Sequence, residues 1–206
     1  LDTKKCDINA KDNKGKTPLH YACQLGKNLI IQALLEQDDI EVNSLDQSGS
    51  TALHELAKSL RFDLENLKML LNARIDPNLV DNDGNSAMHL GCIKENNMLI
   101  SNLIELSPIA INPNIVNKKC QTPLFIVCMK GNFIIFTTLF KSKIRDEIDI
   151  NLTSPIYIAA IKCNYFIVSK LLEMDGIDLT LSYDNYQAQS ENTSDIEQYL
   201  NENNNE

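Results

Sequence analysis

The sequence predicts an all-α solenoid in which repeated units, each a short β-turn finger followed by two antiparallel helices, stack along one axis. Two observations carry this prediction. A four-residue motif recurs five times, with starts that lie 34, 35, 36 and 32 residues apart. Apolar residues then follow each copy at intervals of three and four, the periodicity of a helix that buries one face. With 206 residues, 43% hydrophobic and 23% charged, such stacking can bury a sizeable core.

The motif opens the first helix of every unit. Its copies are Thr17-Pro18-Leu19-His20, Thr51-Ala52-Leu53-His54, Ser86-Ala87-Met88-His89, Thr122-Pro123-Leu124-Phe125 and Ser154-Pro155-Ile156-Tyr157. Two short apolar-periodic runs follow each copy, separated by a polar break such as Gly26-Lys27-Asn28. In the third unit the second run contains Leu99, Ile100, Leu103 and Ile104. Each unit is therefore expected to hold two antiparallel helices.

A turn segment precedes each of the first four copies. These segments are rich in Asn, Asp and Gly, which tolerate the left-handed backbone of tight turns, so each predicts a finger. The fourth segment has Cys120 where the others have glycine, and its motif has Phe125 for histidine, so we expect a distorted finger there. In the fifth unit, Asn151 and Leu152 run almost directly into the motif, so we expect no finger.

On these residues the chain resembles an ankyrin-repeat domain, whose unit is about 33 residues long with a Thr-Pro-Leu-His signature. The resemblance covers roughly residues 1–181. It implies five repeats, at approximately 7–41, 42–76, 77–111, 112–149 and 150–181. It also implies L-shaped repeats whose fingers line one edge of a concave groove, where the family places its partner contacts.

The two ends of the array carry further expectations. Leu1 precedes Asp7 by the spacing that separates Leu35 from Glu41, so the chain is expected to continue a longer array; a natural start with a frayed arm is the alternative. Residues 182–200 are expected to form a capping segment, with a helix over 193–200 that covers the last apolar face. Residues 201–206 are rich in Asn and Glu and are expected to be disordered.

Composition excludes several classes of function. A net charge of -9 repels phosphate backbones, so we expect no nucleic-acid partner. No stretch approaches the ~20 apolar residues of a membrane span, so we expect no membrane insertion. The six cysteines lie far apart without a Cys-x-x-Cys pair, which indicates neither a zinc site nor a disulfide framework. A cytoplasmic location, or the host cytosol for a secreted effector, fits this pattern.

No residue pattern indicates chemistry. The three histidines all belong to the motif, and consecutive copies lie about one repeat apart, so they are not expected to converge on a metal or a proton-transfer site. Cys23, Cys92 and Cys128 share one position and are interpreted as small apolar core residues. The sequence has no phosphate loop and no nucleophile elbow. We therefore expect no enzyme activity, no cofactor, no metal and no small-molecule substrate.

The candidate binding residues lie at the ends of the first helices and in the fingers. The last three units repeat an apolar residue followed by lysine, which predicts an apolar stripe beside a lysine ladder. The alternative is that these lysines merely solvate exposed helix ends while the apolar residues pack between repeats. The candidates are Ile93, Lys94, Met129, Lys130, Ile161 and Lys162, with Lys14, Lys16, Lys118 and Lys119 from the fingers.

These observations favour a monomeric, non-catalytic module that binds another protein or peptide in its groove, one that is acidic and partly apolar. The alternative is a regulatory or targeting portion of a larger protein, such as an enzyme, a channel or a secreted effector. The fold alone does not identify the partner.

Overall fold

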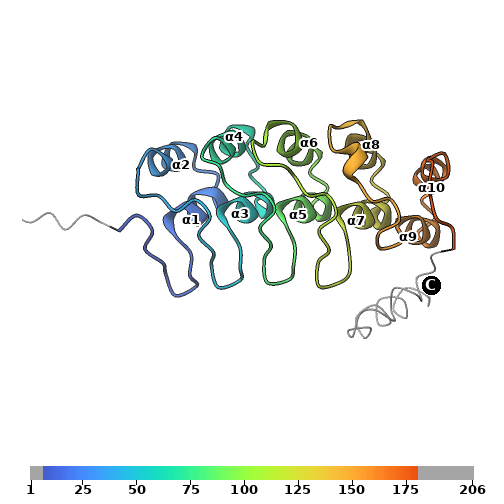
Figure 1. Cartoon of the computed structure of the whole chain (residues 1–206). Helices are drawn as coiled ribbons and strands as arrows, with labels where there is room; N and C mark the ends of the chain where they lie inside the picture. The colour runs from blue at the N-terminus through green and yellow to red at the C-terminus, as the bar shows by residue number, and fades with distance from the viewer. Residues whose placement is uncertain (1–6, 181–206) are drawn as a thin grey trace, which may run out of the picture.

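The computed structural model describes residues 7–180 and confirms the predicted all-α solenoid (Figure 1). Five helix pairs follow one another along the chain. They are α1 (Pro18–Gln24) with α2 (Asn28–Leu35), α3 (Ala52–Lys58) with α4 (Leu64–Asn72), α5 (Ala87–Ile93) with α6 (Asn97–Leu106), α7 (Pro123–Lys130) with α8 (Phe133–Lys141), and α9 (Pro155–Ile161) with α10 (Tyr165–Leu172). We call the first helix of each pair inner and the second outer.

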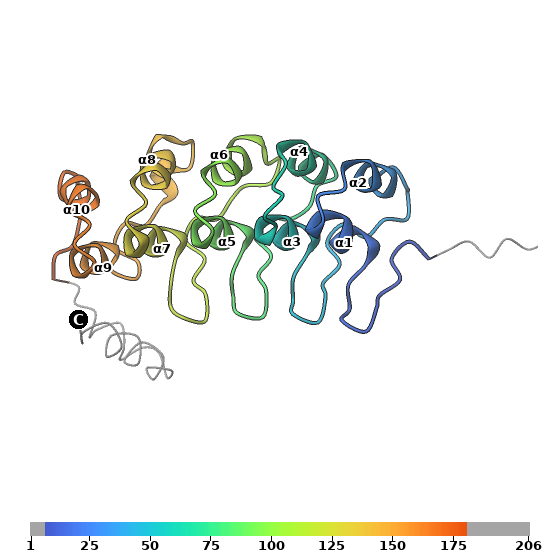
Figure 2. The ribbon, with the colours of Figure 1, turned by 180° about the vertical axis from the view of Figure 1, so that it is seen from behind.

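The inner and outer helices form two parallel rows. Figures 1 and 2 look along the helices from their two ends, and four long loops extend from the inner row, one before each of α1, α3, α5 and α7. These loops are the fingers. The core lies between the rows and between neighbouring pairs, where residues such as Leu56, Leu103 and Leu139 are almost fully buried.

Each of the first three inner helices begins with a capping box in which histidine takes the place of the usual Glu or Gln. In the second repeat the Thr51 backbone N–H donates to His54 Nδ1 at 3.1 Å. Because Nδ1 accepts that bond, the neutral ring carries its proton on Nε2. The free helix N-terminus is thereby satisfied within four residues of sequence.

The same histidines tie each repeat to the next. His20 Nε2 lies 2.8 Å from the Ser50 carbonyl oxygen, His54 Nε2 lies 2.9 Å from that of Asn85, and His89 Nε2 lies 3.0 Å from that of Gln121. The acceptor is each time the residue just before the next inner-helix cap. A residue that the sequence marks as a motif thus becomes an inter-repeat link.

A second ladder is made by asparagines in the segments that lead into inner helices. Asn78 Nδ2 donates to the Ala110 carbonyl at 2.7 Å, while its Oδ1 accepts from the Asn112 N–H at 2.8 Å. Asn9, Asn114 and Asn151 make the same pair of bonds one repeat further on. These side chains supply hydrogen-bond partners to backbone groups that lie outside the helices.

The fourth finger is not distorted, and that expectation was wrong. The Asn117 N–H donates to the Gln121 carbonyl at 3.0 Å, matching the 2.9 Å bond from Asp81 to Asn85 in the third finger. Cys120 adopts a φ of 57°, close to the 78° of Gly84, so it occupies the left-handed conformation that the turn needs. Asn117 Oδ1 accepts the backbone bonds that Asp81 accepts in the third finger, which holds the turn in place.

The fifth repeat lacks a finger, as predicted. Between α8 and α9 the chain forms a 3-10 helix, η1 (Arg145–Glu147), and a tight turn in which the Ser154 N–H donates to the Asn151 carbonyl at 3.1 Å. Ser154 precedes α9 with a φ of 51°, whereas Ser86 precedes α5 with an extended backbone. The short connection leaves too few residues for a hairpin.

Among residues 7–180, one buried polar side chain has no hydrogen-bond partner. Asn66 of α4 is fully buried, and neither its Nδ2 nor its Oδ1 has a hydrogen-bond partner. Its place in the outer helix corresponds to Leu99 in α6 and Ile135 in α8. Burying an unpaired amide costs free energy, so this position lowers the stability of the second repeat.

The expectations for the ends of the array fall on residues that lie outside the described part of the chain. These are the continuation before Leu1, the capping segment over 182–200 and the tail over 201–206. Among residues 7–180, no helix has the length and apolar character needed to span a bilayer.

Candidate partner-binding groove

We call groove face the surface on which the sequence predicts the groove, made of the fingers and one side of the inner helices. Side-chain contacts in the first two repeats identify which side this is. Tyr21 of α1 donates to Asp12 of its finger, and Lys58 of α3 donates to Ser50 Oγ at 2.8 Å. By register, the corresponding positions in the later repeats are Leu90, Ile93, Ile126, Met129, Ile158 and Ile161.

The first half of the groove is charged. Glu55 of α3 is nearly buried and forms ion pairs with Lys16 of the first finger and, at 3.8 Å, with Lys58. Lys58 also lies 3.9 Å from an Asp81 carboxylate oxygen of the third repeat. Three consecutive repeats are therefore linked by alternating charges, and this network compensates the burial of Glu55.

Tyr21 and Asp12 extend this polar region. The Tyr21 hydroxyl donates to Asp12 Oδ2 at 2.6 Å. This hydrogen bond, with those from the backbone N–H groups of Lys16 and Lys14, lowers the pKa of the Asp12 carboxyl, and it raises the pKa of the Tyr21 hydroxyl. Lys16 Nζ lies 5.7 Å from the centre of the Tyr21 ring, a distance suited to a cation–π contact.

The second half of the groove is apolar. Leu90 and Ile126 are buried, while Ile93 and Met129 are half-buried and pack against the core. Ile161 is exposed, at the end of α9. The three residues of the expected apolar stripe thus lie at equivalent positions, although two of them also serve the packing between repeats.

The three lysines of the expected ladder lie where the inner helices end. Lys94 follows α5 and is exposed, Lys130 is the last residue of α7, and Lys162 follows α9. Lys130 is not a free charge, because its Nζ lies 3.3 Å from Glu95 Oε1. Glu95 also accepts a hydrogen bond from Asn132, which fixes this pair between the third and fourth repeats.

The four finger lysines occupy two different settings. Lys14, Lys118 and Lys119 are exposed. Two of them also join neighbouring fingers through their backbones: the Lys14 carbonyl accepts from the Gln47 N–H at 2.9 Å, and the Lys118 N–H donates to the Asp83 carbonyl at 2.9 Å. Lys16 points inward to Glu55 instead. Lys16 is therefore part of the charged network rather than a free contact at a finger tip.

Burial favours the neutral forms of two histidines and three cysteines. Burial lowers the pKa of His54 and of His89, although bonds to the Asn85 and Gln121 carbonyls act in the opposite direction. Burial raises the pKa of the Cys23 thiol to about 12 and also raises the pKa of the Cys92 and Cys128 thiols. Within residues 7–180, no three His, Cys, Asp or Glu side chains gather as metal ligands would.

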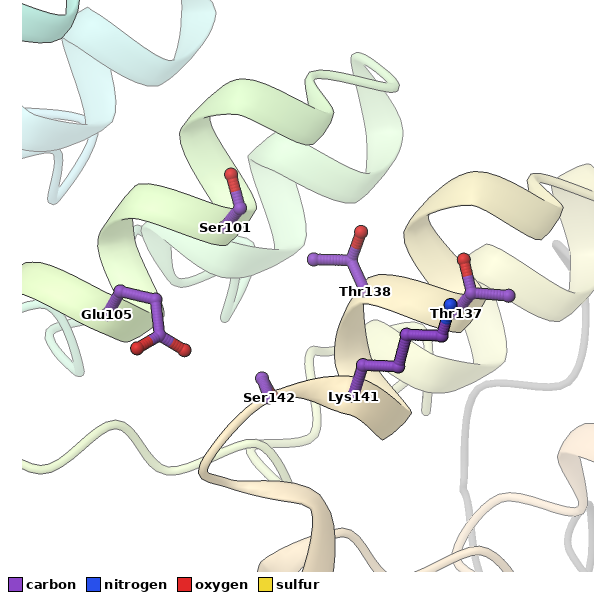
Figure 3. A pocket seen from close by; sticks show the side chains of 6 residues that line it. All are labelled: Ser101, Glu105, Thr137, Thr138, Lys141 and Ser142. Carbon is purple, nitrogen blue, oxygen red and sulfur yellow. The ribbon is translucent and has the colours of Figure 1, made fainter.

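Two shallow hollows lie on the surface. Figure 3 shows one of about 330 Å³ between α6 and α8, lined by Ser101, Glu105, Thr137, Thr138, Lys141 and Ser142. The other, of about 340 Å³, lies between the first two fingers and is lined by Lys14, Lys16, Asp46, Gln47 and Ser48. The second adjoins the charged half of the groove.

Sequence reasoning missed Tyr21, Glu55 and Lys58. Their signal was present, because Glu55 directly follows the motif histidine and Lys58 stands in the same place as Ile93 and Met129. The apolar-lysine pair recurs only in the last three repeats, and the first two have Gln24-Leu25 and Lys58-Ser59 in its place.

Comparison with known proteins agrees with the repeat pattern. Residues 1–81 match the family model for ankyrin repeats, three copies. An ankyrin repeat-containing protein of Schizosaccharomyces pombe is 28% identical over 102 residues, which is 49% of this chain and 44% of that protein. BCL-6 corepressor-like protein 1 of Homo sapiens is 37% identical over 84 residues, and neurogenic locus notch homolog protein 1 of Danio rerio is 33% identical over 84 residues.

The matches cover only part of these relatives. The chain spans under half of the yeast protein, 4% of the human protein and 3% of the fish protein. The similarity therefore concerns the repeats and not the rest of those proteins.

Proposed function

We propose, on the premise that this chain is an ankyrin-repeat domain, that it is a non-catalytic module whose groove binds an acidic and partly apolar segment of another protein. Ankyrin repeats generally mediate protein–protein interactions. The observation that carries the finer proposal is the alignment of Ile93, Met129 and Ile161 beside the lysines that follow them.

The two halves of the groove would then have different roles. In the second half, Ile93, Met129 and Ile161 keep part of their surface accessible and could take an apolar side chain of the partner. Lys94 stands beside them and is exposed, so it would steer an acidic segment toward the stripe. In the first half, Glu55 is already neutralised by Lys16 and Lys58, which lowers its attraction for a basic partner.

The test begins with a pull-down from native cytoplasm, with mass spectrometry to identify the partner. Association with that partner is then measured for Lys94→Glu/Lys130→Glu. Electrostatic steering is screened over ~10 Å at 0.1 M salt, so the variant should associate more slowly and with weaker salt dependence. A matched control, Lys68→Glu/Lys141→Glu, changes the same charge on the outer helices and should bind normally.

Met129→Ala addresses the apolar stripe. If Met129 is an anchor for the partner, this variant should dissociate faster, with a loss of about 1–2 kcal/mol in binding free energy. Circular dichroism shows whether the variants remain folded. Unchanged affinity and salt dependence in both groove variants would place the partner site on the fingers or on the outer helices.

A second candidate is supported by the coverage of the relatives. In the human and fish proteins the matched region is a few per cent of the whole chain. The domain would in that case position or regulate the remainder of a larger protein. Deleting the repeats from the full-length protein should then change the location or activity of the remainder. If the repeats act only as a stand-alone binding module, the location and activity of the remainder should not change.

A further inference from the structure

The edge where inner helices lead into outer helices has an unusual composition. We define this connector edge as residues 25–30, 59–65, 94–98, 130–134 and 162–166. Six large apolar side chains in the described residues are more than 60% exposed, and five of them lie on it. They are Leu60 (98%), Leu29 (81%), Tyr165 (73%), Phe166 (70%) and Ile134 (65%); the sixth is Leu179 (66%).

Each connector also carries a base. These are Lys27, Arg61, Lys94, Lys130 and Lys162, one for each of the five repeats. The acids on the same edge are Asp63, Glu65 and Glu95. Glu95 is paired with Lys130, Glu65 lies 3.5 Å from Lys68 Nζ, and Asp63 accepts from Asn28, so all three acids already have partners.

The opposite ends of the helices are acidic on balance, but unevenly: segment 107–113 after α6 carries no charge, and segments 73–79 after α4 and 142–149 after α8 carry both signs. The segment 36–42 that follows α2 contains four acids and no base, and the segment 173–179 that follows α10 contains three acids and no base. The two helices of a repeat are antiparallel, so the acidic segments lie at one end of the helices and the connector edge lies at the other. Figures 1 and 2 view the helices from these two opposite ends. The molecule is therefore polarised across the helix axes despite its net negative charge.

We propose that the connector edge docks the domain, edge-on, to an anionic membrane surface. Exposed Leu, Ile, Phe and Tyr side chains partition into the boundary between headgroups and acyl chains, and nearby bases attract anionic lipids. The acidic segments at the far edge favour this orientation because they stay away from the negative surface. The contact is interfacial and needs no spanning helix.

The shape of the edge favours a bilayer over a protein groove-binder. Leu60 and Leu29 protrude into solvent instead of lining a hollow, and both hollows described above involve other residues. A protein partner would need matching cavities for side chains that come from four repeats, between the first and the fifth. A headgroup layer deforms around protruding side chains, so it accepts them at irregular spacing without a fixed complementary shape.

The proposal is tested by sedimentation of the 206-residue chain with phosphatidylcholine vesicles, with and without phosphatidylserine. Binding is expected only to the anionic vesicles and should fall as salt is raised. Leu29→Ser/Leu60→Ser should weaken it about a hundredfold, because each of the two exposed side chains contributes roughly a tenfold factor on burial. The matched control Val80→Ser/Val116→Ser alters exposed finger residues and should bind as the parent does.

Charge is tested separately with Lys27→Glu/Arg61→Glu against Lys143→Glu/Arg145→Glu, which makes the same charge change on the acidic side. Only the first pair should abolish binding to phosphatidylserine vesicles. Absence of binding by the parent chain, or equal loss in both charge pairs, would overturn the proposal. The proposal would also be overturned if the parent chain did not bind vesicles and the edge variants lost binding to a protein partner. The connector edge would then be a docking surface for a protein. The connector edge shares Lys94, Lys130 and Lys162 with the groove, but none of the residues substituted on the edge belongs to the groove, so vesicle binding can fail while the proposed function stands.

Discussion

The first four repeats and the fifth have the same pair of helices but are joined differently. Each junction among the first four has a backbone bond between fingers and a histidine bonded to the next repeat, such as Asn82 N–H to Ser48 carbonyl and His54 to Asn85. At the last junction Phe125 replaces the histidine and no finger follows. The links described there include Asn164 to the Cys128 carbonyl at 2.7 Å, Thr122 to Thr153 at 3.3 Å and the Asn114 pair.

This difference predicts that polar cross-links, and not helix pairs alone, set how strongly neighbouring repeats are coupled. The stability of a repeat array is approximately a sum of repeat terms and nearest-neighbour terms. The fifth repeat has one neighbour among the described residues and lacks two kinds of link. It should therefore open at lower free energy than the second, third and fourth repeats.

The largest effect is expected from a pair of matched core truncations. Leu103 of α6 and Leu171 of α10 are fully buried at the same position of the outer helix. Leu103→Ala should lower the free energy of unfolding of the array by about 2–5 kcal/mol. Leu171→Ala should mainly remove exchange protection from the fifth repeat and leave the main urea transition close to that of the parent. Equal shifts of that transition would refute the difference in coupling.

A smaller effect of opposite sign is expected at Asn66. Asn66→Leu removes the unpaired buried amide and restores the residue type found in α6, so it should stabilise the chain by about 1–3 kcal/mol. Urea denaturation measures this gain. Asn72→Leu, at the exposed end of α4, is the control and should stay within about 0.5 kcal/mol of the parent. This gain should increase the difference in opening free energy between the fifth repeat and the other repeats.

Acidification should weaken the histidine-linked junctions. The pKa of His54 and of His89 is lowered by burial, so the folded state binds fewer protons than the unfolded state near the ordinary histidine value of about 6.5. The resulting stability is fully present above that pH and is lost as pH falls through the folded pKa. The melting temperature should therefore decrease from pH 7 to pH 5, a range above the titration of the carboxylates.

The control is His54→Phe/His89→Phe, which copies the residue that the fourth repeat uses. It should be less stable at pH 7 by about 1 kcal/mol for each lost bond, because the carbonyl acceptors lose their partners. Its melting temperature should depend less on pH than that of the parent. Parallel pH curves for the two proteins would show that these histidines do not govern the acid response.

The smallest effect is expected from relieving backbone strain in the fourth finger. Cys120 has a φ of 57°, which glycine adopts without a steric penalty, so Cys120→Gly should raise stability by about 0.5–1 kcal/mol. Cys163 has a φ of 54° in the fifth repeat. Cys163→Gly should act on the local opening of that repeat only, as seen by hydrogen exchange. If both variants stabilised the main unfolding transition, the fifth repeat would be coupled to its neighbour as strongly as the other repeats are.

Much of the fold and part of the candidate site could be predicted from sequence because their chemistry is local. Thr51 and His54 form their capping box within four residues, and Asp81 bonds the backbone of Asn85 within its own turn. The missing fifth finger follows from a shortage of residues. Where prediction went wrong, at Cys120, the left-handed conformation was available to a residue type that seldom adopts it, and bonds to Asn117 held the turn.

The sequence by itself determined the period, the helix starts and the alternation of apolar positions, since each depends on residues a few positions apart. Only the tertiary structure decided that Lys16 meets Glu55, 39 positions away, that Asn66 is buried without a partner, and that Leu60 is almost wholly exposed. These outcomes depend on the offset and rotation with which one repeat stacks on the next. That geometry is fixed by packing across whole helix faces, and no short stretch of the chain contains it.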